Sequence, residues 1–149
     1  MKKLIRTGLP VIIVALAVLQ FFGPDRTNPP EDPSATFEAV AQPPKQVMAV
    51  IERSCRDCHT NRTRWPWYSR VAPASFLVAQ DVKRGRAHLN FSEWRGLSPE
   101  ITALKMHEVC IEVTRGDMPL WYYLPAHAEA KLSAEDIKTL CSWPAQNNK

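Results

Sequence analysis

Two thiols and an imidazole lie together in one pentapeptide, Cys55-Arg-Asp-Cys58-His59. Cysteines at this spacing can bond the two vinyl groups of one haem, and the residue that follows can place its imidazole under the iron as proximal ligand. The same C-x-x-C spacing also forms redox-active dithiols and contributes half of many zinc sites. The remaining sequence must indicate whether these residues form a haem attachment site, a redox-active dithiol or part of a zinc site.

Met118 could supply a second axial ligand to such an iron. It stands 59 residues after His59, just past a predicted helix end and directly before a proline that fixes its loop. A methionine ligand raises the reduction potential of a haem relative to a second histidine. We therefore predict that His59 and Met118 are the protein ligands of the iron. Five other candidates are more typical of surface or core positions: Met48, Met106, His88, His107 and His127.

An aromatic segment follows the pentapeptide. It contains Trp65, Trp67 and Tyr68 and few residues that favour helices. We expect a loop that packs over the haem edge and brings these three aromatic side chains into contact with the cofactor. Aromatic residues bury equally well without a porphyrin, so ordinary core packing is the alternative.

Five arginines surround the same motif. They could pair with the haem propionates or present a positive rim to an acidic partner protein. An ordinary solvated face is the alternative. These residues are Arg53, Arg56, Arg62, Arg64 and Arg70.

The N-terminus has the pattern of an export signal. Three basic residues precede an uncharged apolar run, Leu9–Phe22. Phe21 and Phe22 are too bulky for a signal peptidase site, so we expect an uncleaved transmembrane signal anchor over residues 1–23, at the short end of what crosses a bilayer. A buried core helix is the alternative. The basic flank would keep the N-terminus in the cytoplasm and place the rest of the chain outside it.

Proline is concentrated after this run, with six of the 13 prolines between residues 24 and 44. This composition cannot hold a helix and offers little to bury, so it predicts an extended linker over residues 24–44. Such a spacer would hold a domain formed by residues 45–149 off the membrane surface while leaving it some freedom to reorient.

Helical patterns account for most of the remaining chain. Residues 45–54 lead into the pentapeptide, a second helix follows Pro73 and ends near Gly85, and a last helix at 133–143 should cross the first and close the domain. The longest is expected at 99–115, with serine as N-cap, proline at its first position and glycine just past its end. The fold class is therefore all-α, with one helical domain after the anchor.

Cys110 and Cys141 fall one in each of the last two helices, on the predicted inner face. In an exported protein, two such cysteines often form a disulfide, which would tie the closing helix to the helix before Met118. Two buried free thiols are the alternative.

The length and the net charge of the chain limit its domain organisation and the classes of partner that can be expected. With 149 residues the chain is long enough for one domain plus an appendage. The formal net charge of +4 comes from basic residues that are dispersed rather than aligned along one helix, so no nucleic-acid partner is expected.

Four sequence motifs and one histidine occur in the order Cys55–Ser75, Asp81–Arg86, Asn90–Trp94, Gly116–Leu120 and His127. In this order they resemble the small bacterial haem-binding domain family, over about residues 29–143. The resemblance implies a membrane-tethered, cytochrome c-like domain of the periplasm with one haem c, attached through Cys55 and Cys58 and ligated by His59. It places Met118 where a cytochrome c keeps its sixth ligand, and it implies no reaction.

One-electron transfer without catalysis is the leading hypothesis for such a domain, with redox proteins of the periplasm or inner membrane as partners. If Met118 is weakly bound, a haem-based sensor or a gas- or peroxide-binding domain is the alternative. A thiol oxidoreductase using Cys55 and Cys58 would need an alternating strand and helix pattern that the sequence lacks. A zinc site lacks a second pair of neighbouring cysteines.

Overall fold

The computed structural model describes the backbone of residues 2–146 and the side chains of residues 8–143. All regular secondary structure in this part of the chain is helical, which confirms the all-α class. The α-helices are α1 (Lys2–Leu19), α2 (Phe37–Ala41), α3 (Lys45–Ser54), α4 (Arg56–His59), α5 (Ala74–His88), α6 (Pro99–Arg115) and α7 (Ala134–Gln146). Four short 3-10 helices complete the described structure: η1 (Pro33–Ala35), η2 (Trp67–Arg70), η3 (Leu124–Ala126) and η4 (Ala128–Ala130).

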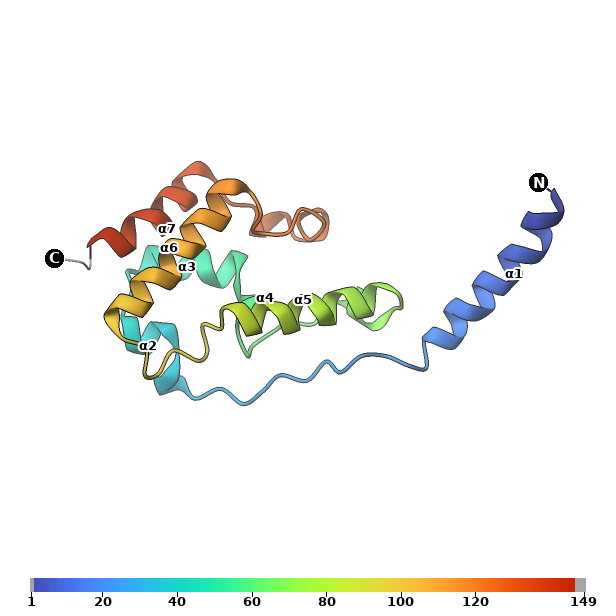
Figure 1. Cartoon of the computed structure of the whole chain (residues 1–149), viewed down its shortest axis with the longest axis horizontal. Helices are drawn as coiled ribbons and strands as arrows, with labels where there is room; N and C mark the ends of the chain where they lie inside the picture. Colours follow the sequence, from blue (N-terminus) through green and yellow to red (C-terminus); the bar gives the residue numbers. More distant parts are fainter. Residues whose placement is uncertain (1, 147–149) are drawn as a thin grey trace.

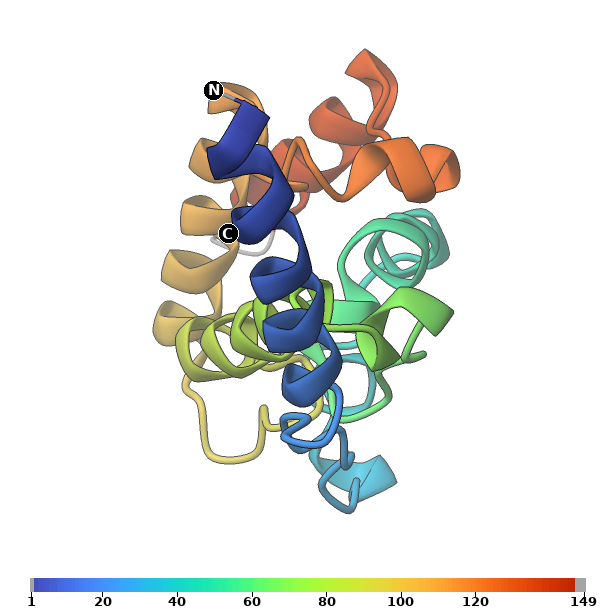
Figure 2. The same ribbon diagram turned by 90° about the vertical axis from the view of Figure 1, so that its right-hand side faces the viewer.

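The helices after α1 form one body. α7 packs against α6 and α3, as predicted for the closing helix, and α5 packs against α4 and η2. α1 projects from one end of this body, and an extended segment runs from it along the outside of the other helices to α2 (Figure 1). In the view turned by 90°, α1 lies in front of the rest of the chain (Figure 2).

Helix α6 has the predicted ends. The Ser98 hydroxyl accepts a hydrogen bond from the backbone N–H of Ile101, and Pro99 occupies the first turn, where its missing N–H costs nothing. Gly116 ends the helix at φ 77°, a left-handed conformation that glycine adopts without strain. The predicted disulfide between Cys110 and Cys141 is confirmed, with the two Cα atoms 4.9 Å apart, and it joins α6 to α7.

The core is built around an aromatic cluster. The ring of Phe37 lies 4.7 Å from that of Trp94 and 5.3 Å from those of Phe91 and Trp143, measured between centroids. Tilted and edge-on pairs at these distances are favourable beyond the area that they bury. The other buried members of the core are Val47, Val50, Ile51, Met106, Val113 and Leu140.

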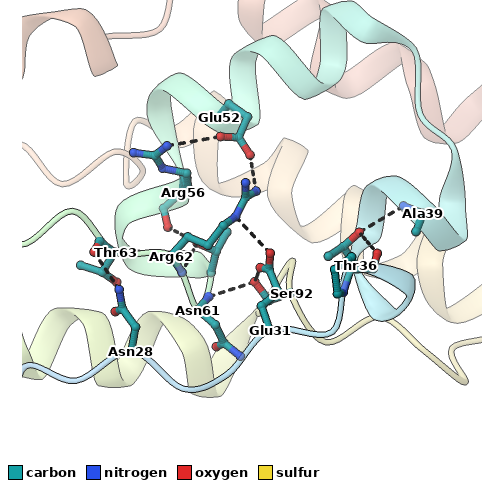
Figure 3. A network of polar contacts seen from close by, with 12 residues as sticks. Asn28, Glu31, Thr36, Ala39, Glu52, Arg56, Asn61, Arg62, Thr63 and Ser92 are labelled. Atoms are coloured by element: carbon teal, nitrogen blue, oxygen red, sulfur yellow. Dashed lines mark hydrogen bonds and ion pairs between the residues drawn. The ribbon is translucent and has the colours of Figure 1, made fainter.

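The segment expected to be a free linker is instead part of the domain. It is extended from Gly23 to Asp32, but the Asn28 side chain donates to the carbonyl of Thr63 at 3.0 Å, and Glu31 accepts a hydrogen bond from Ser92 (Figure 3). Phe37, fully buried, then brings α2 into the core. The expectation that this segment cannot hold a helix is wrong, because α2 forms between Pro33 and Pro43. Proline does not prevent the side chains between the prolines from docking. Residues on both sides of the boundary predicted at residue 45 therefore contact each other in the structure.

A helix forms over most of the residues expected to be a signal anchor. The apolar side chains from Leu9 to Phe22 along α1 and its end are exposed, and Gln20 exchanges two hydrogen bonds with the backbone of Ala72. In the described part of the chain, no helix is both long and apolar enough to cross a bilayer.

Candidate functional site

A cavity of about 670 Å³ lies between the end of α3, α4, α5, α6 and the loop that follows α6. Its size falls within the range of small-molecule and cofactor sites. Cys55, Cys58, His59 and Met118 all line it. The structure thus brings together the four residues that the sequence predicts to hold a haem, although Met118 is 59 positions away from His59.

Local backbone geometry presents the pentapeptide to this cavity. α3 ends at Ser54, Cys55 connects it to α4, and the backbone N–H of His59 donates to the carbonyl of Cys55 at 3.0 Å. This single turn places Cys58 and His59 on the wall of the cavity. A hydrogen bond of 2.8 Å from the Thr60 hydroxyl to the carbonyl of Arg56 closes the turn.

The imidazole of His59 has the tautomer and the charge of a metal-ligating histidine. Its Nδ1 lies 3.0 Å from the carbonyl oxygen of Leu89, and because a carbonyl only accepts hydrogen bonds, Nδ1 must carry the proton. Nε2 then keeps a free lone pair, as in most metal-ligating histidines. Burial lowers the pKa of His59, so the ring is neutral at physiological pH, the form that ligates metals.

Cys55 and Cys58 are free thiols rather than a disulfide. Burial raises the pKa of both thiols to about 12, and for Cys58 the nearby carboxylates of Asp81 and Asp57 add to this effect. A catalytic dithiol needs the opposite, a pKa lowered toward neutrality so that one sulfur is a thiolate. The environment of these cysteines therefore argues against a thiol oxidoreductase.

Met118 is held at the cavity by the end of α6. The backbone N–H groups of Asp117 and Met118 both donate to the carbonyl of Glu112, at 3.0 and 3.3 Å. The half-buried side chain packs against the core. Among the other candidate axial ligands only His88 lines the cavity, whereas Met106 is buried in the core.

The remaining walls of the cavity fit a haem. The hydroxyl oxygen of Ser54, next to Cys55, is buried and has no hydrogen-bond partner among the described residues. Three basic side chains, Arg84, His88 and Lys105, also line the cavity and could pair with the two carboxylates of a haem. Among the side chains of residues 8–143, no group of three or more His, Cys, Asp or Glu is arranged to hold a metal ion. A haem iron requires no such group because the porphyrin supplies four of its ligands.

Gly85 brings α5 against the pentapeptide. A Cβ atom at this position would lie 2.6 Å from the carbonyl oxygen of Cys58, closer than real Cβ contacts. The sequence suggested that Gly85 marks the end of a helix, but α5 continues to His88. The glycine is needed instead for the close approach of two helices.

The aromatic residues predicted to contact the haem lie elsewhere. Trp65 and Trp67 are not among the side chains that line the main cavity, and Trp67 is 77% exposed. Tyr68 lines a smaller adjoining cavity of about 280 Å³, where its hydroxyl pairs with Nε2 of His127 at 2.7 Å. The aromatic residues at the main cavity are Phe91, which belongs to the core cluster, and Tyr122 and Tyr123. Tyr122 and Tyr123 could have been predicted from the sequence because they follow Met118 by four and five residues.

The five predicted arginines do not line the main cavity either. Arg53 pairs with Asp136 at 2.8 Å, and Arg62 pairs with Glu52 at 2.6 Å. Arg56 is buried and lies 3.5 Å from Glu52, while Arg64 and Arg70 are exposed. Most of these arginine side chains therefore form ion pairs at the surface or pack next to the pentapeptide. The basic side chains at the cavity, Arg84, His88 and Lys105, belong to α5 and α6 instead.

Comparison with known proteins adds one finding. A family model described as a haem-binding domain matches residues 14–146. No curated protein and no solved structure matches the chain.

Proposed function

This chain belongs to the haem-binding domain family, and from that premise we propose that it is a single-haem c-type cytochrome that transfers one electron at a time. The observation that carries the proposal is the convergence of Cys55, Cys58, His59 and Met118 on one cavity. When bound, the haem iron would supply the chemistry by accepting and releasing a single electron.

Each residue has a distinct role in this proposal. The thiols of Cys55 and Cys58 would hold the haem covalently through its two vinyl groups. Nε2 of His59 and the sulfur of Met118 would be the protein ligands of the iron. Arg84, His88 and Lys105 would pair with the propionates, and the apolar walls would limit the access of water.

We propose further that the domain is anchored to the bacterial inner membrane and faces the periplasm. The basic residues at the N-terminus followed by the exposed apolar residues 9–22 support this location. The disulfide between Cys110 and Cys141 supports it independently, because disulfides persist in oxidising compartments such as the periplasm. Redox proteins of the periplasm or the membrane would be the donor and acceptor.

An electron carrier, rather than an enzyme or a gas sensor, needs an iron whose two axial positions are both held by the protein. We therefore expect the reduced wild-type protein to take up carbon monoxide slowly and incompletely. Replacement of Met118 with alanine should raise the rate of carbon monoxide binding at least about tenfold, because the thioether no longer competes. The change is followed by the absorption of the reduced haem after rapid mixing.

Met48→Ala is the matched control for this experiment. Met48 is also partly buried against the core but does not line the cavity, so its replacement should leave carbon monoxide binding unchanged. Rapid and complete binding by the wild-type protein would reject the carrier and support a sensor or ligand-binding role.

A further inference from the structure

The loop between Gly116 and α7 is fastened to the opposite wall of the cavity by two tyrosines. The hydroxyl of Tyr123 donates to Oδ2 of Asp57 at 3.2 Å, and the hydroxyl of Tyr122 donates to Oδ2 of Asp81 at 3.1 Å. Asp81 belongs to α5, whereas Asp57 is one of the two residues between the cysteines of the pentapeptide. The segment that carries Met118 is therefore bonded directly to the segment that carries His59.

The acceptor in this contact is held in place. Oδ1 of Asp57 accepts from the backbone N–H of Arg64 at 3.2 Å and from Nη2 of Arg56 at 3.3 Å. These bonds fix the plane of the carboxylate and leave Oδ2 for Tyr123. Hydrogen bonds to an ionised acceptor are about twice as strong as those between neutral groups.

The donor is fixed as well. The ring of Tyr123 stacks on that of His127, with centroids 4.0 Å apart and planes 8° from parallel. Burial, followed by the negative charge of Asp57, raises the pKa of Tyr123, so its hydroxyl remains a proton donor throughout the physiological range.

We propose that the hydrogen bond between Tyr123 and Asp57 is a latch that holds the Met118 loop against the pentapeptide and so determines how firmly Met118 closes the sixth position of the iron. The proposal rests on the function proposed above for Met118. Tyr123 and Asp57 are positioning residues, because they act on the iron only through the loop. The latch would link the two axial sides of the haem, whose ligands come from distant parts of the chain.

Tyr123→Phe in the full-length, haem-loaded protein tests the latch, because it removes one oxygen atom and keeps the stacked ring. The rate of carbon monoxide binding to the reduced protein should rise roughly tenfold, the usual cost of losing a hydrogen bond to a charged group. Tyr68→Phe is the matched control, since it removes a phenol oxygen whose partner is His127 rather than the pentapeptide. It should leave the rate within about twofold of wild type.

Hydrogen–deuterium exchange provides a second readout that does not depend on the iron. In Tyr123→Phe, the backbone amides of Met118 and Tyr123, which are hydrogen-bonded to the carbonyls of Glu112 and Leu120, should exchange about tenfold faster than in wild type and in Tyr68→Phe.

The possible outcomes distinguish failure of the proposed latch from failure of the proposed Met118 ligand. Loop exchange equal to that of wild type overturns the latch. Faster exchange with unchanged carbon monoxide binding, in a protein whose Met118→Ala variant does bind faster, overturns its role at the iron. If Met118→Ala has no effect, the proposed sixth ligand is wrong, and the exchange rates alone decide whether the latch exists.

Discussion

Replacement of His59 with alanine is expected to reduce the amount of haem held per chain by at least about tenfold. The loss is expected because Nε2 of His59, whose ring is fixed by the carbonyl of Leu89, would position the haem while the thiols of Cys55 and Cys58 react with its vinyl groups. The haem remaining in the variant should be high-spin, since one strong axial ligand is missing. Haem per chain is measured from the pyridine haemochrome spectrum of purified protein, and the spin state from its absorption spectrum.

His88→Ala is the control for this prediction. His88 lines the same cavity but is assigned to the propionates, so its loss should preserve a low-spin spectrum and most of the haem. If His59→Ala kept a wild-type spectrum and His88→Ala lost it, the proximal ligand would be His88 and the assignment of His59 would be wrong.

Replacement of Phe37 with alanine is expected to lower the free energy of unfolding by about 3–5 kcal/mol. Phe37 is fully buried and contacts three aromatic rings of the core, so truncation leaves a large cavity at its centre. Urea denaturation of the full-length protein, followed by circular dichroism, measures the change. This variant tests whether the proline-rich segment belongs to the domain.

Val40→Ala is the matched control because it lies on the same short helix but is 39% exposed. Its effect should be within about 0.5 kcal/mol. Equal stability of Phe37→Ala and wild type would show that residues 24–44 are a detachable linker after all.

The helical frame was predictable because its signals are local. Ser98, Pro99 and Gly116 mark the ends of α6, and the structure places these ends where the sequence does. The same holds for the run that becomes α3 and leads into Cys55. Caps and periodicity depend on residues within a few positions of each other, so one sequence is sufficient to detect them.

The docking of the proline-rich segment was not predictable from composition. Proline content reports which backbone conformations are excluded, and the segment is indeed extended before α2. Whether Asn28 finds the carbonyl of Thr63, or Phe37 finds a place beside Trp94, depends on contacts with residues far along the chain. Long-range pairing of this kind leaves no local pattern.

The candidate site likewise contains some residues that local sequence patterns identify and others that depend on contacts between distant parts of the chain. Cys55, Cys58 and His59 carry their chemistry in their spacing, and Met118 is marked by a helix end and a proline. The aromatic and basic residues around the cavity were assigned by proximity in sequence to the pentapeptide, which selected Trp65 and Trp67. The chain instead turns away there, and Tyr122 and Tyr123 reach the cavity from the loop after α6.

Covalent attachment of haem is the central claim, and one measurement on the wild-type protein tests it most directly. The full-length chain is produced in a bacterial strain that matures c-type cytochromes, denatured, separated on a gel and stained for haem, with a pyridine haemochrome spectrum recorded in parallel. We predict one haem that remains with the denatured chain and a spectrum typical of two thioether bonds, both lost when Cys55 and Cys58 are replaced by serine. A wild-type chain that carries no haem after denaturation would contradict the account.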